Sequence, residues 1–95
     1  MLFVIFCVDK DDHGHVRAAN RPAHLAHLKS LGERLKLAGP MTTEDGSAMT
    51  GSLIVIEAVD LAAAQAVAAA DPYAPAGLFA RADVRPWRQA IPAPN

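Results

Sequence analysis

The sequence predicts a single α+β domain with the element order βαββαβ. Three observations support this prediction. The 95 residues allow one hydrophobic core and leave no room for a second. Hydrophobic residues make up 52% of the chain and charged residues 20%, which is enough apolar material for a packed interior. Four β-rich runs are interleaved with two helical segments, and turn-forming residues separate them.

The first half of the chain predicts a strand, a helix and a second strand. Leu2–Val8 is a continuous apolar run, which is typical of a strand buried on both faces at the centre of a sheet. After the charged loop DKDDHGH, we expect a helix to begin near Arg21 with Pro22 at its first position, and to end by Gly39-Pro40. A short strand should follow around residues 36–41. The helix has one apolar stripe, formed by Leu25, Leu28, Leu31 and Leu35.

The second half predicts a hairpin, a helix and a last strand. Residues 42–51 are polar and contain glycine, so we expect a hairpin loop that leads into the strand Ser52–Ala58. Asp60 is a suitable N-cap for the alanine-rich helix that follows, and Asp71-Pro72 should end it. In the last strand, Leu78–Trp87, alternate residues give one apolar face and one mixed face.

The element order favours a ferredoxin-like antiparallel sheet with both helices on one face, because strand crossovers are right-handed. The first strand is apolar on both faces, and the helices can cover only one of them. We therefore expect a homodimer in which two sheets pack face to face as a dimeric α/β barrel, or a ligand cleft on the open face. Residues 1–95 form one domain, and residues 88–95 are expected to be a loose C-terminal tail.

Charge and cysteine content limit the possible partners. The net charge is −1, so the chain lacks the basic excess that nucleic acid or an anionic membrane would require. Cys7 is the single cysteine, so no intramolecular disulfide can form, and its apolar surroundings predict a buried thiol. Leu2–Val8 is too short to span a membrane and has no preceding basic segment of a signal peptide. We expect a soluble, cytoplasmic protein.

One histidine lies where the first predicted helix should be apolar. With Leu28 at the centre of the stripe, His24 lies at about −40° and Arg21 at about +20° by the helical spacing. Both side chains should therefore face the sheet near the start of the helix. His24 can be a neutral core histidine bonded to a carbonyl, or a general base that needs an orienting carboxylate.

Asp71 is the candidate carboxylate, and it too has two interpretations. It can cap a new turn opened by Pro72. It can also lie beside His24, because this topology allows the start of the first helix and the end of the second to meet at one end of the sheet. The sequence leaves both open.

Other polar residues have a structural and a functional interpretation. Arg17 and Arg21 can be surface residues or a fork for a substrate carboxylate, and Ser52 can be an ordinary strand residue or a donor to a ligand. His13 and His15 lie in an acidic loop, but their spacing is not a usual zinc pattern. The sequence contains no phosphate-binding glycine loop, nucleophile elbow or Cys-x-x-Cys motif.

Several short blocks are distributed along the chain, namely MLFVIFCVDK, Arg17, Arg21-Pro22-Ala23-His24-Leu25, LAGPM, TGS, ADPYAPAG and VRPWR. Together they resemble the YciI-like family, that of the YCII-related domain. The resemblance implies a dimeric α/β barrel of ferredoxin-like subunits, with an active site centred on a histidine, which matches His24, and an aspartate, which we assign to Asp71. It also connects the chain to a dehydrochlorinase of a chlorinated lactone-type aromatic breakdown product, and to the muconolactone isomerases, which share the fold.

These observations predict a cofactor-free enzyme that abstracts a proton from a small organic acid or lactone, in an elimination or an isomerisation. His24 would move the proton and Asp71 would orient the imidazole. A carboxylate-bearing ligand would be bound by Arg17, Arg21, Ser52 and Tyr73, and no metal is expected. The alternative is a dimer that binds a small ligand or acts as a scaffold without chemistry.

Overall fold

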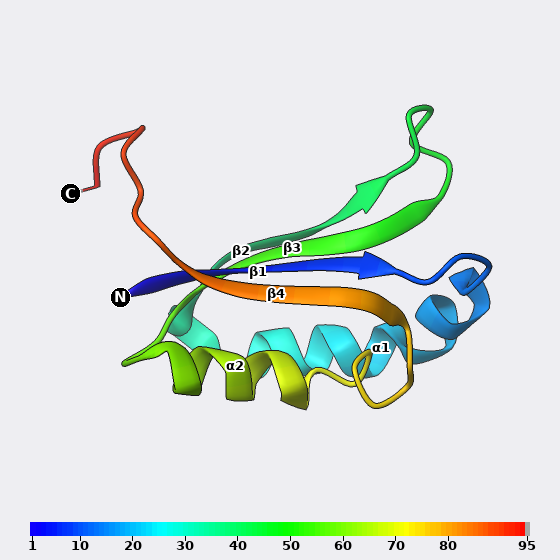
Figure 1. The fold of residues 1–95 in the computed structure, drawn as a ribbon, viewed down its shortest axis with the longest axis horizontal. Coiled ribbons are helices and arrows are strands. Elements are labelled where there is room, and N and C mark those ends of the chain that lie inside the picture. The colour runs from blue at the N-terminus through cyan, green and yellow to red at the C-terminus, as the bar shows by residue number, and fades with distance from the viewer. Residues whose placement is uncertain (95) are drawn as a thin grey trace.

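The computed structural model describes residues 1–94 and has a four-stranded antiparallel sheet with two helices on one face (Figure 1). The strand order is β2-β3-β1-β4, and each neighbouring pair is antiparallel. The fold is therefore the predicted ferredoxin-like α+β fold. The elements are β1 (Leu2–Asp9), α1 (Gly14–Ser30), the short 3-10 helix η1 (Gly32–Arg34), β2 (Leu35–Thr42), β3 (Met49–Glu57), α2 (Leu61–Ala70) and β4 (Phe79–Trp87).

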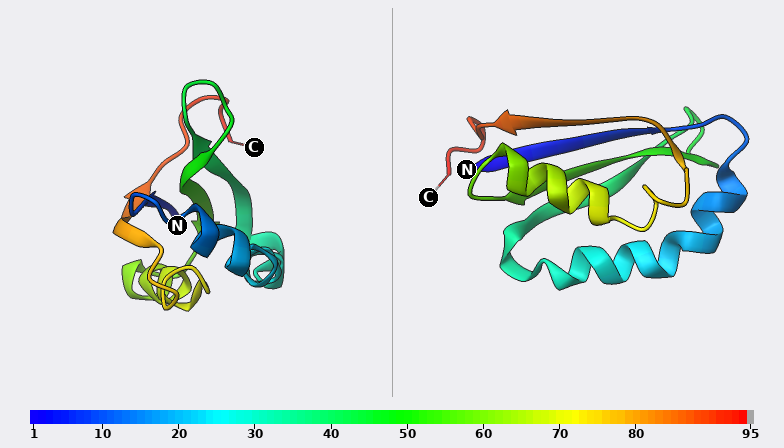
Figure 2. Two further views of the ribbon diagram at one scale, coloured as in Figure 1. Left: turned by 90° about the vertical axis from the view of Figure 1, so that its right-hand side faces the viewer. Right: turned by 60° about the horizontal axis from the view of Figure 1, so that its bottom comes forward.

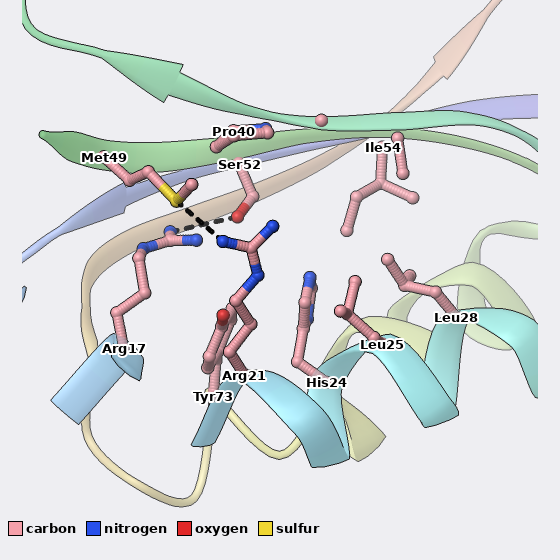
Figure 3. Close-up of a pocket in the computed structure, with 12 residues that line it drawn as sticks. Arg17, Arg21, His24, Leu25, Leu28, Pro40, Met49, Ser52, Ile54 and Tyr73 are labelled. Carbon is pink, nitrogen blue, oxygen red and sulfur yellow. Dashed lines mark hydrogen bonds between the residues drawn. The ribbon is translucent and has the colours of Figure 1, made fainter. Parts of the chain in front are cut away.

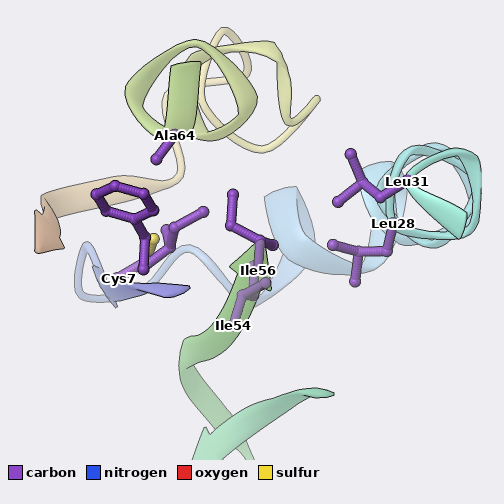
Figure 4. Close-up of a cluster of buried hydrophobic side chains, with 8 residues drawn as sticks. Cys7, Leu28, Leu31, Ile54, Ile56 and Ala64 are labelled. Atoms are coloured by element: carbon purple, nitrogen blue, oxygen red, sulfur yellow. The ribbon is translucent and has the colours of Figure 1, made fainter. Parts of the chain in front are cut away.

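The hydrophobic core lies between the sheet and the two helices (Figure 4). Alternate residues of β1 point into it, because successive side chains of a strand face opposite sides. Ala64 of α2 is fully buried, and its small side chain lets this helix approach the sheet closely. The buried members are Phe3, Ile5, Cys7, Leu28, Leu31, Ile54, Ile56 and Ala64.

Helix α1 begins at Gly14, well before the predicted start near Arg21, and Pro22 lies inside it. The prediction was wrong because Pro22 suits a first helical position, whereas here it follows two full turns. Proline has no N–H, so the carbonyl of Ala18 loses its partner in the helix, and helices usually bend at such a point. The first turns of α1 lie at an angle to the remainder (Figure 2), which directs Arg17 toward the end of β1.

The end of α1 was also predicted wrongly. The helix ends at Ser30, and Gly32 follows with a φ of 58°, a left-handed conformation that commonly terminates helices. Leu35 therefore belongs to β2, although it still packs against the core. Leu25 is 40% exposed and does not belong to the buried stripe. None of the helices in residues 1–94 combines the length and apolarity needed to cross a membrane.

Strand β3 begins at Met49, so the hairpin loop is shorter than the predicted residues 42–51. Gly51 lies inside the strand, opposite Val8 of β1 and Met41 of β2. A Cβ atom at this position would overlap the carbonyl of Cys7 and the side chain of Met41. The close approach of the strands therefore requires glycine at this position.

Strand β4 has an irregularity that the predicted alternation missed. Asp9 pairs with Phe79 whereas Val8 pairs with Arg81, so Ala80 is an extra residue in the ladder. This shift reverses the alternation, and both Phe79 and Val84 pack against the core. The prediction placed these two residues on opposite faces.

The sheet face opposite the helices carries the other side chains of β1. Val4 lies opposite Val55, and Phe6 lies opposite Leu53, so apolar side chains meet across the two central strands. Leu37 and Leu53 are exposed large hydrophobic residues on this face. A row of charged residues borders it on β4, formed by Arg81, Asp83 and Arg85.

The chain continues beyond β4 as an irregular segment. Ile91 there is 91% exposed, so it does not pack onto the domain. Asn95, the last residue of the predicted tail, lies outside the described residues. That residues 88–95 are loose stays a prediction.

Candidate active site

A pocket opens between α1 and the sheet, and four parts of the chain form it (Figure 3). Its volume is about 150 Å³. Helix α1 supplies most of its polar groups, β2 and β3 form the opposite wall, and the segment after α2 supplies Tyr73. The lining residues are Arg17, Arg21, His24, Leu25, Leu28, Ala38, Gly39, Pro40, Met49, Ser52, Ile54 and Tyr73.

His24 is in direct contact with Asp71, 47 residues further along the chain. Its Nδ1 atom lies 2.8 Å from Oδ2 and 3.0 Å from Oδ1 of that carboxylate. Because an ionised carboxylate only accepts hydrogen bonds, Nδ1–H of His24 is the donor. This contact leaves Nε2 as the ring nitrogen that can accept a proton. Both side chains are buried, His24 with 9% and Asp71 with 5% of its side-chain surface exposed.

Asp71 also caps the turn after α2, which is the other interpretation that the sequence offered. Its Oδ1 atom accepts a hydrogen bond from the backbone N–H of Tyr73, at 3.0 Å. The two interpretations are thus compatible, because a carboxylate has enough acceptor sites for both contacts. The backbone of the turn fixes the carboxylate in the position where it meets His24.

Arg17 is a buried residue whose guanidinium is held by Asp9 and Ser52. Its Nε donates to Oδ2 of Asp9 at 2.7 Å, and one Nη donates to Oδ1 at 2.9 Å and to Oγ of Ser52 at 3.1 Å. Burial lowers the pKa of the Arg17 guanidinium, but the hydrogen bonds and charge of Asp9 outweigh it, so the pKa lies above its ordinary value. Arg17 lines the pocket as one half of an ion pair.

Sequence reasoning did not select Asp9. The sequence places this residue first in the charged loop DKDDHGH, whereas it is the last residue of β1 and its side chain is almost fully buried. A carboxylate at the end of a buried strand, eight residues before an arginine, was the available signal. It became meaningful only with the early start of α1, which aims Arg17 at this strand.

Arg21 differs from Arg17 in its surroundings. It lies one turn further along α1, is exposed to solvent and lines the pocket. Its Nη1 atom donates to the sulfur of Met49 at 3.7 Å, which is a weak contact. Within residues 1–94 it forms no salt bridge, so its charge is available to a ligand.

Tyr73 lies at the centre of the polar cluster. Its ring stacks on the imidazole of His24, with centroids 4.1 Å apart and planes 16° apart. The Arg17 guanidinium carbon lies 4.7 Å from the Tyr73 ring centroid, a cation–π distance, and Phe79 packs against the ring edge-on. Tyr73 has no exposed surface, and its hydroxyl finds no hydrogen-bond partner within residues 1–94.

Cys7 lies in the core and we expect its thiol to be unreactive. Burial, and after it the negative charge of Asp71, raises the pKa of Cys7 to about 12. Because the thiolate is the reactive form, iodoacetamide should not label the folded protein near neutral pH and should label it in denaturant. Mass spectrometry of the alkylated protein measures this. Fast labelling of the folded protein would contradict the assignment of Cys7 to the core.

His13 and His15 do not extend the pocket. Their ring centroids lie 5.9 Å apart, and Nδ1 of His13 donates a hydrogen bond to the backbone carbonyl of Asp11 at 2.7 Å. In the part of the chain that the structure describes, no three potential metal-binding side chains come together.

Comparison with known proteins places the chain among relatives of the same length. The YCII-related domain matches residues 1–88. The protein YciI of Escherichia coli is 43% identical over 96 residues, which covers 94% of this chain and 98% of the relative, and an uncharacterized protein of Haemophilus influenzae is 38% identical over the same span. The solved 5-chloro-2-hydroxyhydroquinone dehydrochlorinase of Burkholderia phenoliruptrix, in complex with 2,5-dihydroxybenzoquinone, has a TM-score of 0.86 and 35% identity, covering 95% of this chain and 96% of its own. The chain belongs to the YCII-related domain family, as its sequence blocks predict.

Proposed function

We propose that the protein is a cofactor-free enzyme that abstracts a proton from a small organic acid or lactone, in an elimination or an isomerisation. The observation that carries this proposal is the buried contact between His24 and Asp71 on the wall of a pocket. A histidine held by a carboxylate through Nδ1–H presents Nε2 as a base, and the carboxylate stabilises the imidazolium that forms.

The other polar residues of the pocket would bind and orient the substrate. Arg21 is exposed and outside any salt bridge of the described residues, so it can pair with a substrate carboxylate. Ser52 accepts a hydrogen bond from Arg17 and keeps its own hydroxyl hydrogen for a ligand. Arg17 and Tyr73 complete the polar side, and Leu25, Leu28 and Ile54 supply the apolar side.

The similarity to the dehydrochlorinase supports an elimination. That protein is named for the loss of hydrogen chloride from its substrate, and such a loss requires a base to remove a proton. The two chains are 35% identical and agree over nearly their whole length. A proton-abstracting pocket in this fold is consistent with that chemistry.

The proposal is tested by an assay that detects proton removal from more than one substrate. The protein is incubated in D₂O with 5-chloro-2-hydroxyhydroquinone and with a panel of single-ring lactones and keto acids. Chloride release measures elimination, and deuterium incorporation seen by NMR measures isomerisation. No chloride release and no deuterium above the protein-free rate, over the whole panel, would favour the non-catalytic binding or scaffold dimer.

We also expect a homodimer formed through the open sheet face. Substitution of Leu53 by Lys should shift the protein toward monomer, because a charge in an apolar interface must be desolvated. Sedimentation velocity at micromolar concentration measures the change. Leu61→Lys is the matched control, because Leu61 is an equally exposed leucine on α2, at the other face. A wild-type protein that sediments as a monomer would contradict the dimer.

A further inference from the structure

Two groups in the pocket are poised to bind a negatively charged oxygen. The first is the hydroxyl of Tyr73, which is fully buried and without a hydrogen-bond partner within residues 1–94. A buried hydroxyl left unpaired costs about 1–3 kcal/mol, so its retention beside a cavity points to a ligand atom as its partner. The second is the guanidinium of Arg21. Both side chains extend toward the pocket with His24 (Figure 3).

Arg17 is not a third such group, because its charge is already matched. Two of its nitrogens contact Asp9, and one of these also contacts Ser52. Its guanidinium lies over the Tyr73 ring, which it helps to hold in place. Arg17 is therefore a positioning residue, and Arg21 is the cation of the pocket lining that stands outside the salt bridges of residues 1–94.

Tyr73 has the protonation state that a donor needs. Burial raises the pKa of its hydroxyl, and the nearby charges of Arg17 and Arg21 only partly oppose this rise. The hydroxyl therefore keeps its proton at neutral pH. The Tyr73 and His24 rings stack on each other, so the hydroxyl donor and the imidazole base lie on neighbouring, nearly parallel rings.

We propose that Tyr73 and Arg21 form an oxyanion site next to the base His24, and that the substrate is a carbonyl compound whose reactive C–H bond is adjacent to the carbonyl carbon. This inference rests on the proposed function. The cavity of about 150 Å³ accommodates roughly one six-membered ring, since an engineered protein cavity of about that volume binds benzene. The substrate is thus a single-ring or similarly small carbonyl compound.

The reaction step balances with these residues alone. The C–H bond breaks and its proton moves to Nε2 of His24. The electron pair of that bond forms a carbon–carbon double bond, and the carbonyl π pair moves onto oxygen. Tyr73 O–H and Arg21 N–H donate to this enolate oxygen, which carries more charge than the carbonyl it replaces. In an elimination, the carbonyl re-forms, the carbon–carbon pair makes a double bond to the neighbouring carbon as the leaving group departs from it as an anion, and His24 releases its proton to solvent. In an isomerisation, His24 returns the proton to another carbon that is conjugated with the enolate.

A phenolate is a suitable probe, because its charged oxygen resembles that of an enolate. The probe is 4-nitrophenolate, at a pH above its own pKa, and binding is measured from its absorbance change or by calorimetry. Tyr73→Phe keeps the stacked ring and removes only the hydroxyl. We expect this variant and Arg21→Gln each to weaken phenolate binding by about tenfold or more, the usual effect of losing a hydrogen bond to a charged group.

Nitrobenzene is the matched control ligand, since it has the same ring without the charged oxygen. Its binding should be the same for wild type, Tyr73→Phe and Arg21→Gln, which also verifies that the variants keep the pocket. Phenolate binding by Tyr73→Phe equal to that of wild type would overturn the oxyanion site, as would the absence of phenolate binding by wild type.

Failure of this inference can be distinguished from failure of the proposed function. If the D₂O assay detects turnover that Tyr73→Phe leaves unchanged, the oxyanion site is wrong and the enzyme remains. If phenolate binding depends on Tyr73 while no substrate exchanges or eliminates, the oxyanion site holds for ligand binding and proton abstraction is wrong.

Discussion

Substitution of His24 by Asn should lower turnover by about 10²–10⁴-fold, the usual contribution of a general base. The amide nitrogen of asparagine takes the place of Nδ1 and can still donate a hydrogen bond to Asp71, but the amide cannot accept a proton from a substrate. Nε2 is the ring nitrogen that the substitution removes, and it is the free one because Nδ1 is engaged by Asp71. The D₂O and chloride assays measure the loss, once a substrate has been found.

Helix α1 provides a matched control for this substitution. His27 lies three residues after His24 but does not line the pocket, and its Nε2 donates to the backbone carbonyl of Val67 at 3.1 Å. The amide of His27→Gln can make the same contact, so this variant should retain full turnover. Equal activity of His24→Asn and wild type would exclude His24 as the base, whatever the substrate.

Substitution of Asp9 by Ala should lower the free energy of unfolding by about 3–5 kcal/mol. The variant removes the carboxylate and leaves the Arg17 charge buried without compensation, which is the costly case for an ion pair. Urea denaturation followed by circular dichroism measures the effect. The double variant Asp9→Ala, Arg17→Met should be less destabilised than Asp9→Ala, because the unpaired charge is gone.

The surface ion pair between Arg81 and Asp83 is the control for this prediction. Its nitrogen–oxygen distance is 2.8 Å, close to that of the buried pair, but 66% of the Arg81 side-chain surface is exposed. Asp83→Ala should therefore lower the free energy of unfolding by less than about 1 kcal/mol. Similar losses of unfolding free energy for Asp9→Ala and Asp83→Ala would mean that the cost of removing the aspartate does not depend on the burial of its arginine partner.

The sequence predicted the elements whose signals are local. The apolar run of β1, the Asp60 cap of α2 and the order of strands and helices followed from periodicity and turn residues, and Asp60 does accept a hydrogen bond from the N–H of Ala63. The contact between His24 and Asp71 was one of two interpretations that the sequence left open, since the topology permits the two ends of the helices to meet.

The errors arose where tertiary structure overrides a local signal. Pro22 is a strong helix-start residue, yet α1 continues through it. Ala80 looks like a regular strand residue, yet the pairing shifts there and brings Phe79 to the core side. Asp9 looked like a loop residue because its partner Arg17 lies on helical turns that were not predicted. Each of these depends on a neighbour distant in sequence.

The double attachment of Asp71, to His24 and to the backbone of Tyr73, has a consequence for how such a protein can diversify. The fold itself holds the two side chains in contact before any ligand arrives. Ligand preference can then vary at the mouth of the pocket, where Leu25 is exposed and lies outside the buried core. An exchange at Leu25 should change which molecules enter while affecting stability by only about 0.5 kcal/mol, as for most surface substitutions. New ligand preferences can therefore evolve while the contact between His24 and Asp71 stays unchanged.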